Sequence, residues 1–314
     1  MKFALRVILA TDGDTTPSQP VSKPRAWLMA ARPKTLPAAV APVIVGSALA
    51  YHDGVFAPLP ALAALAGALL FQIAVNFAND YFDYVKGIDT ADRLGPTRVT
   101  ASGLIAPGEL RLGLAAVLGL ALLVGAYLVS VGGWPVAVIG LASIFALLAY
   151  SGGPFPLASH GLGDLTVFIF FGLAGVCGTY YVQARALTPT VVVAALPVGA
   201  LITAILVVNN LRDIDTDRRT GKRTLAVILG ARRTRLEYAA LVGAAYLIPG
   251  LLWAGGAFPV WVILPWGSLV LAWRAVESIY ARTGPALNTL LADTARLTLI
   301  FSVLLAVGFV VSAS

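Results

Sequence analysis

The sequence predicts an all-α membrane protein, a polytopic bundle of about nine transmembrane helices. Apolar residues make up 59% of the 314-residue chain and charged residues only 12%, with a mean hydropathy of +0.86. A soluble globular domain is much less apolar than this. The apolar residues also gather in runs of roughly 17 to 22 residues, the length of helix that crosses the hydrocarbon core of a bilayer. We therefore expect this chain to lie within a lipid bilayer.

Short breaks that contain proline, glycine or charged side chains separate the apolar runs. The expected spans are residues 36–51, 59–79, 110–130, 134–150, 163–183, 189–209, 235–254, 257–273 and 291–312. At the N-terminus, Arg6 interrupts a short apolar patch and acidic residues follow it, which is unlike a cleaved signal peptide. We therefore expect a cytoplasmic N-terminal tail over residues 1–24 and a transmembrane domain over residues 25–314.

Lysine and arginine are distributed very unevenly over the connections between these spans. If the spans alternate in direction, all 22 basic residues except Arg185 fall on one side of the membrane. Basic residues accumulate in cytoplasmic loops, so we expect a multi-pass protein of the cell membrane with its N-terminus in the cytoplasm. The net charge of +7 then follows from this orientation and from anionic lipid, and it gives no reason to expect a nucleic-acid partner.

A first acidic cluster follows the second apolar run. If the helix continues through it, Asn76, Asp80 and Asp83 lie at i, i+4 and i+7 and share one helix face. No cation accompanies this face in the local sequence, and a carboxylate at a bilayer centre costs about 2.5–3.5 kcal/mol. A divalent cation held by oxygen ligands would supply the missing positive charge.

A second acidic cluster follows the sixth apolar run. Asn209, Asp213 and Asp217 recur at i, i+4 and i+8, which again predicts one polar helix face. The two clusters follow spans that are four apart, so they lie on the same side of the membrane. This spacing is consistent with a parallel repeat of four spans plus four, with the ninth span appended.

Together the two clusters predict a site for a diphosphate. Lysine or arginine follows each cluster, and carboxylates that hold magnesium beside cations that hold phosphate oxygens are suited to binding a diphosphate. The neighbouring apolar helices favour a lipid diphosphate. Two rival classes fit less well. A phosphatidyltransferase carries its carboxylates in one compact motif, and a cation-coupled transporter needs ionisable residues near mid-membrane, where no expected span has one.

Two other cytoplasmic segments carry polar side chains whose roles stay open. Before the first span, Arg32 and Lys34 either anchor the helix at the membrane interface or contact a bound anion. Between the fourth and fifth spans, a Gly- and Pro-rich connection contains Tyr150 and Asp164, and such backbone is tolerated near a membrane where it lines a polar cavity. Asp164 is alternatively a helix N-cap that faces water.

Several short motifs occur along the chain in a fixed order. They are Ala-Arg-Pro-Lys-Thr-Leu-Pro at 31–37, Asn-Asp-Tyr-x-Asp, Lys-Gly-x-Asp and Asp-Arg-x-Gly-Pro within 79–96, Gly-Leu-Gly-Asp at 161–164, and Asn-Asn-Leu-Arg-Asp with Gly-Lys-x-Thr-Leu within 209–225. Together these motifs resemble the UbiA superfamily of intramembrane prenyltransferases. The resemblance is strongest to the branch of that superfamily that acts on 1,4-dihydroxy-2-naphthoate.

The resemblance implies a nine-helix fold with two Mg²⁺ ions. It also implies transfer of a polyprenyl chain from polyprenyl diphosphate to 1,4-dihydroxy-2-naphthoate, with release of CO2 and diphosphate, to give demethylmenaquinone in menaquinone biosynthesis. Another aromatic acceptor, 4-hydroxybenzoate or homogentisate, is the alternative, because enzymes for these acceptors share the same metal chemistry.

The resemblance also implies roles for individual residues. The expected metal ligands are Asn76, Asn79, Asp80, Asp83, Asp89, Asp213 and Asp217, and the aspartates at 80, 83, 213 and 217 are also expected to be catalytic. Asp89 is included because the superfamily's third aspartate, four residues after Asp83, is Gly87 here. The residues expected to bind substrate are Arg32, Lys34, Lys86, Arg93, Arg98, Tyr150, Asp164, Asn209, Asn210 and Lys222. Of these, Lys34 and Arg98 are candidates for the acceptor carboxylate, because both are expected outside the acidic faces.

Overall fold

The computed structural model describes residues 21–88 and 94–313, and this part of the chain is helical without a named strand. The long elements are α3 (Pro37–His52), α4 (Pro58–Val85), α5 (Pro107–Gly132), α6 (Trp134–Ser151), α7 (Gly163–Val167) with η3 (Phe168–Leu173) and α8 (Ala174–Ala184), α9 (Pro189–Arg212), α11 (Leu225–Ala254), η4 (Val260–Ser268) with α12 (Leu269–Ala281), and α13 (Leu287–Val311). The short elements are α2 (Lys23–Ala31), η1 (Pro33–Thr35), η2 (Leu157–Ser159), α10 (Ile214–Arg219) and η5 (Gly284–Ala286).

In the described part of the chain, 8 helices are long and apolar enough to cross a membrane. The number is 9 if the pair Lys23–Thr35 and Pro37–His52, bent by 50°, counts as one span. The predicted all-α bundle of about nine spans is therefore confirmed, whereas the repeat of four spans plus four stays a prediction. Proline begins α3, α4, α5 and α9. Proline is tolerated there because the N–H groups of the first helical turn have no acceptor within the helix, so the N–H that proline lacks breaks no hydrogen bond.

The seventh span begins earlier than the sequence predicts. α11 starts at Leu225, where the Thr224 hydroxyl accepts a hydrogen bond from the Val227 N–H at 3.4 Å, and it is kinked at Gly230, whose φ of 77° and ψ of 160° are not helical. The unbroken part of the span therefore begins after Gly230. Arginines 232, 233 and 235, which the sequence analysis placed in a connection, therefore lie on α11. Long cationic side chains can run along an apolar helix and keep their charged ends at a polar surface, so these arginines do not end the helix.

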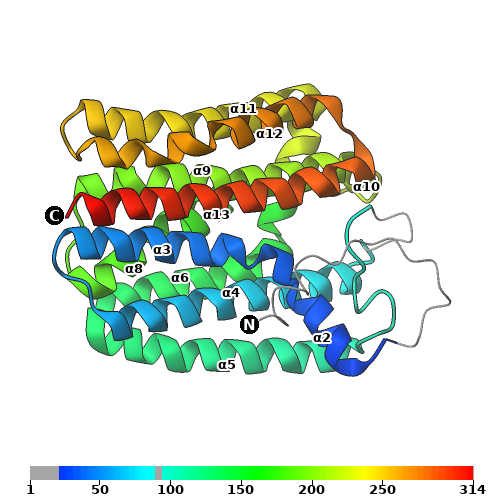
Figure 1. Cartoon of the computed structure of the whole chain (residues 1–314). Coiled ribbons are helices and arrows are strands. Elements are labelled where there is room, and N and C mark those ends of the chain that lie inside the picture. Colours follow the sequence, from blue (N-terminus) through cyan, green and yellow to red (C-terminus); the bar gives the residue numbers. More distant parts are fainter. Residues whose placement is uncertain (1–20, 89–93, 314) are drawn as a thin grey trace.

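The long helices run side by side, with α11 and α12 at one edge of the bundle and α5 at the other (Figure 1). Between them α9 packs against α11, α13 and η3, and most of its side chains are buried. The contact between η3 and α9 requires glycine, because a Cβ added at Gly172 would lie 2.3 Å from the Gly199 Cα. η3 is a π-helical turn, and such turns are frequent at functional sites.

Polar segments gather at one end of this bundle. Figure 1 shows α2 and α10 at the end opposite the C-terminus of α13. Between η1 and α2 the chain turns sharply at Arg32, which has a left-handed φ of 49°. The sequence predicts that this end faces the cytoplasm, and both acidic clusters are found here.

Candidate active site

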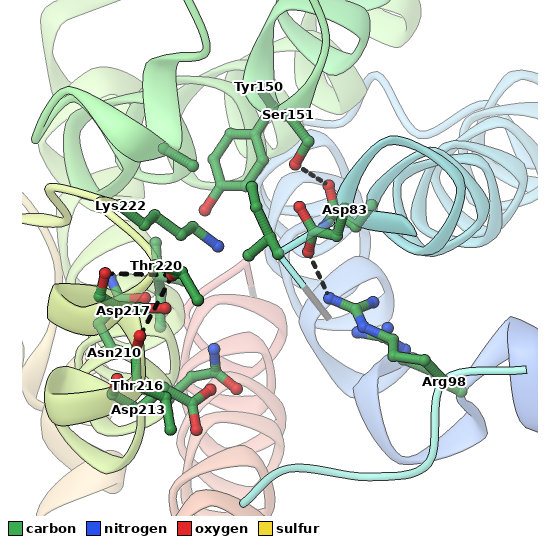
Figure 2. Close-up of a pocket in the computed structure, with 16 residues that line it drawn as sticks. Asp83, Arg98, Tyr150, Ser151, Asn210, Asp213, Thr216, Asp217, Thr220 and Lys222 are labelled. Atoms are coloured by element: carbon green, nitrogen blue, oxygen red, sulfur yellow. Dashed lines mark hydrogen bonds and ion pairs between the residues drawn. The ribbon is translucent and has the colours of Figure 1, made fainter. Parts of the chain in front are cut away.

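A polar pocket of about 80 Å³ lies at the end of the bundle that carries α2 and α10. Asp83 of the first acidic cluster faces Asp213 and Asp217 of the second across it, and Lys222 and the Tyr150 ring extend toward the space between them (Figure 2). The pocket-lining residues that the sequence predicted are Arg32, Asn79, Asp83, Arg98, Tyr150, Asn209, Asn210, Asp213, Asp217 and Lys222. Asp89 and Arg93 lie outside the described residues.

The first acidic cluster has a cationic partner. The Arg98 Nη2 donates to the Asp83 Oδ2 at 2.7 Å, and both side chains are buried. Two expectations are therefore wrong: that no cation lies beside this face, and that Arg98 lies outside it. The segment after residue 94 folds back over the end of α4, a contact that local sequence does not reveal. A buried carboxylate and guanidinium in contact each reduce the cost of burying the other.

The other two residues of this α4 face, Asn76 and Asp80, do not line the polar pocket. The Asp80 carboxylate accepts hydrogen bonds from the backbone N–H groups of Val99 at 3.1 Å and Thr100 at 3.2 Å. The Asn76 amide donates to the Ala31 carbonyl at 2.9 Å and to the Thr35 hydroxyl at 3.1 Å. In contrast, Asn79 lies at the pocket, where its Oδ1 accepts from the Ser151 hydroxyl at 2.7 Å.

The second acidic cluster also carries its own cation. Arg212 holds both carboxylate oxygens of Asp213, with Nε to Oδ1 at 2.8 Å and Nη2 to Oδ2 at 2.6 Å. The same guanidinium donates to the side-chain oxygens of Asn209 and Asn288, each at 2.8 Å. Such a bidentate pair fixes the orientation of the carboxylate. The sequence analysis missed Arg212, although it directly precedes Asp213.

The helix changes at Asp213, but the predicted face persists: the Asp213 N–H donates to the Asn209 carbonyl at 3.2 Å, the Asp217 N–H donates to the Asp213 carbonyl at 2.8 Å, and all three residues line the pocket. α9 ends at Arg212 and α10 begins at Ile214, so Asp213 lies at the break between two helices. The threonines at 216 and 220, which the sequence analysis did not single out, line the pocket beside Asp213 and Asp217. Asp215 points to solvent with its side chain 81% exposed, and it pairs with Arg218 at 3.5 Å.

Two of the predicted substrate-binding residues line neither the pocket nor its apolar extension. The Lys86 Nζ donates to the backbone carbonyls of Ser151 at 2.6 Å and Gly153 at 3.3 Å, which joins the end of α4 to the end of α6. Partial burial lowers the pKa of Lys86; the negative charge of Asp83 opposes this effect, and the positive charge of Lys222 adds to it.

Asp164 is buried at 6% exposure and makes no helix-capping hydrogen bond, so its interpretation as a solvent-facing N-cap is wrong.

An apolar cavity of about 1280 Å³ adjoins the polar pocket. It extends between α3, α4, α5, α6 and α8, and its volume exceeds the roughly 300–1,000 Å³ of ordinary ligand pockets. Lys34, Gln72 and Asn76 lie on its wall near the polar end. The residues that line both spaces are Arg32, Asn79, Tyr150, Leu206 and Asn209. The two spaces therefore meet, and together they fit a molecule with a charged head and a long apolar tail.

The donor atoms on the pocket wall fit magnesium. Among the described residues, no group of three His, Cys, Asp or Glu side chains could hold a metal ion. Magnesium does not require such a group, because it usually takes one or two carboxylates and completes its shell with water and substrate phosphate. Asp83 on one wall and Asp213 with Asp217 on the other supply carboxylates, and amide and hydroxyl oxygens surround them.

A helical membrane fold in which a polar pocket opens into a long apolar cavity defines a protein that handles an amphiphile with an anionic head. The chain matches the model of the UbiA prenyltransferase family over residues 39–292, and it belongs to this family.

Curated relatives and solved structures agree with this family. The 1,4-dihydroxy-2-naphthoate octaprenyltransferase of Haemophilus influenzae is 35% identical and matches 92% of this chain and 97% of its own. The protein of that name from Mycobacterium tuberculosis is 39% identical and matches 89% and 95%. The structure of a UbiA homolog from Archaeoglobus fulgidus bound to GPP and Mg²⁺ has a TM-score of 0.65 at 15% identity and covers 91% of this chain and 99% of that one. At such low identity the structural likeness shows the fold alone.

Proposed function

We propose that this protein is a magnesium-dependent prenyltransferase of the cell membrane, with its site toward the cytoplasm. In this proposal it transfers a polyprenyl chain from polyprenyl diphosphate to 1,4-dihydroxy-2-naphthoate, releases CO2 and diphosphate, and forms demethylmenaquinone. The observation that carries the proposal is the junction of the polar pocket with the apolar cavity. A polyprenyl diphosphate has the same division into charged head and apolar tail, so its reacting carbon lies at this junction.

The pocket residues bind and orient the diphosphate head. Magnesium, two ions in this proposal, would when bound supply positive charge that neutralises the diphosphate and stabilises it as a leaving group. Asp83, Asp213 and Asp217 would hold the metal, and their lining of the pocket supports this role. Arg98 and Lys222 lie among them and donate hydrogen bonds to phosphate oxygens. Because the donors are already in place in a largely buried pocket, little reorganisation is needed during the reaction.

The acceptor binds at the rim where the cavity meets the polar end. The new carbon–carbon bond forms at the ring carbon that bears the carboxylate. The electron pair of the carbon–carboxylate bond returns to the ring as CO2 leaves, and the electron pair of the broken carbon–oxygen bond leaves with diphosphate. The acceptor carboxylate therefore needs a contact that does not persist through the reaction, because equally strong binding of substrate and transition state does not raise the rate. Lys34, an exposed residue on the cavity wall, supplies a single flexible ammonium group for this contact.

The acceptor assignment rests on the relatives that bear this enzyme name, and a labelled acceptor tests it. The purified protein with magnesium, polyprenyl diphosphate and naphthoate labelled at the carboxyl carbon should release one labelled CO2 for each chain transferred. Prenylation that keeps the label, or prenylation of 4-hydroxybenzoate or homogentisate instead, would contradict the naphthoate assignment and leave the prenyl transfer standing. No transfer to any of the three acceptors would contradict the whole proposal.

A further inference from the structure

One face of α4 binds the segments that carry the cationic residues of the site. Gln72, Asn76 and Asp80 follow one another at i, i+4 and i+8 along this face. The Gln72 Nε2 donates to the Thr35 hydroxyl at 3.1 Å, and Asn76 donates to the same hydroxyl and to the backbone carbonyl of residue 31. These bonds hold the bend between α2 and α3, which carries Arg32. Asp80 continues this pattern one turn further along.

The Asp80 carboxylate is fully engaged by one short backbone segment. Its two oxygens accept from the N–H groups of Val99 and Thr100, and the side chain is only 1% exposed. That segment is itself closed by backbone bonds, from the Ser102 N–H to the Arg98 carbonyl at 3.0 Å and from the Leu104 N–H to the Val99 carbonyl at 2.9 Å. Asp80 therefore holds a compact turn that begins at Arg98.

Asp80 and Asp83 are close in sequence, but they differ in what they face. Asp83 lines the polar pocket, whereas Asp80 lines neither the pocket nor the apolar cavity. A metal ion on Asp80 would have to take the place of two buried N–H donors, and a buried donor that loses its acceptor destabilises the folded protein. Arg98 begins the turn that Asp80 holds, and its guanidinium lies 2.7 Å from the Asp83 carboxylate.

We infer that Asp80 is a positioning residue and not a magnesium ligand: it fixes the turn at residues 98–102 so that Arg98 reaches Asp83 and the diphosphate head. The inference rests on the proposed function for the diphosphate alone, and the identity of the aromatic acceptor does not affect it.

A comparison of two aspartate variants separates positioning from metal binding. Asp80→Asn replaces one acceptor oxygen with an NH2 group that faces a backbone N–H, and it should weaken binding of polyprenyl diphosphate about tenfold. The magnesium concentration that half-saturates this binding should stay at the wild-type value in Asp80→Asn and rise in Asp83→Asn. Asp53→Asn is the matched control, because Asp53 accepts from the Tyr180 hydroxyl at 2.5 Å and lines neither the pocket nor the cavity. A raised magnesium requirement in Asp80→Asn would overturn the inference.

The role of Arg98 is tested by a double-mutant cycle. If Asp80 acts through Arg98, Asp80→Asn should weaken diphosphate binding in the wild-type background and add almost nothing in an Arg98→Ala background. A full additional loss in that background would show that Asp80 acts on the ligand by another route.

A measurement on the unmodified protein keeps the inference testable if a variant does not fold. Hydrogen exchange of the peptide that contains Val99 and Thr100 should stay slow when Mg²⁺ and inorganic diphosphate are added, because the carboxylate keeps its two N–H donors. Faster exchange at these amides on addition of Mg²⁺ and diphosphate would mean that the metal takes the carboxylate, and would overturn the inference. This readout needs no turnover, so it can fail or succeed independently of the prenyl-transfer assay.

Discussion

At the residue scale, each pocket carboxylate that contacts an arginine contributes to stability as well as to binding. Arg98 is buried beside Asp83, and Arg212 is buried beside Asp213. Removal of one member of a buried ion pair typically costs about 3–5 kcal/mol, whereas replacement of both members by apolar residues is often neutral. Loss of activity in a single aspartate variant therefore combines two effects that have to be measured separately.

We expect Asp83→Ala to abolish turnover and to lower the unfolding temperature in detergent. The double variant Asp83→Ala with Arg98→Met should recover much of the lost stability, since it no longer buries a guanidinium without this carboxylate, but it should stay inactive. Thermal unfolding followed by tryptophan fluorescence, beside a prenyl-transfer assay, distinguishes the two effects. Near wild-type activity in the single variant would contradict the metal-binding role of Asp83.

Lys34 is expected to contact the acceptor and not the prenyl donor. Lys34→Ala should raise the KM for the naphthoate about fivefold, a modest effect because the side chain is exposed and its charge is screened. Binding of polyprenyl diphosphate should change much less. Lys23→Ala is the matched control, because Lys23 lies in the same region but pairs with Glu109 at 2.6 Å and lines neither the pocket nor the cavity. Equal effects on donor and acceptor binding would reject this role for Lys34.

At the element scale, the apolar cavity depends on small residues on the helices around it. Gly140 on α6 and Gly178 on α8 both line it, and a Cβ added at either position would meet no atom within 4 Å. The space beside these glycines belongs to the cavity, so a larger side chain there occupies volume available to the substrate tail and leaves the packing between helices unchanged.

Gly178→Leu should therefore shift the donor preference toward shorter polyprenyl diphosphates. The expected change is about tenfold in the ratio of kcat/KM for a long donor to that for a short one, since small changes in the fit of an apolar pocket are worth about 1–3 kcal/mol. Gly243→Leu on α11 is the control, because it also has open space at Cβ but does not line the cavity. An unchanged ratio in Gly178→Leu would place the prenyl tail elsewhere.

At the scale of the whole molecule, orientation in the membrane decides which compartment supplies the substrates. The basic residues predict that α10 faces the cytoplasm, and the connection between α11 and α12 lies at the other end of the bundle (Figure 1). In a Cys177→Ser background, which removes the single cysteine, a cysteine at exposed Asp215 should react with an impermeant reagent only from the cytoplasmic side. A cysteine at exposed Ala257 should react only from outside. The reverse pattern would invert both the topology and the predicted location of the site.

The sequence alone determined the membrane fold, the approximate positions of the spans, the two acidic clusters and the resemblance to a family of prenyltransferases. These features depend on the length of apolar runs and on the spacing of neighbouring residues, which are local properties of the chain. The start of the seventh span was placed too late because arginines at 232, 233 and 235 are typical of a loop, and the Arg235 guanidinium donates to the Ile279 and Arg282 carbonyls, which are far away in the chain.

Only the tertiary structure decided which polar residues face the pocket and which hold it together. Asp80 and Asp83 belong to one motif, but the segment after residue 94 gives them different partners. Its backbone N–H groups donate hydrogen bonds to Asp80, and its Arg98 side chain forms an ion pair with Asp83. Arg212 likewise joins Asp213 to Asn288, far away in the chain. Helical spacing describes which side chains share a face of one helix, but it cannot show which distant backbone donors and cations come to rest on that face, because those contacts form only when the helices and their connections pack together.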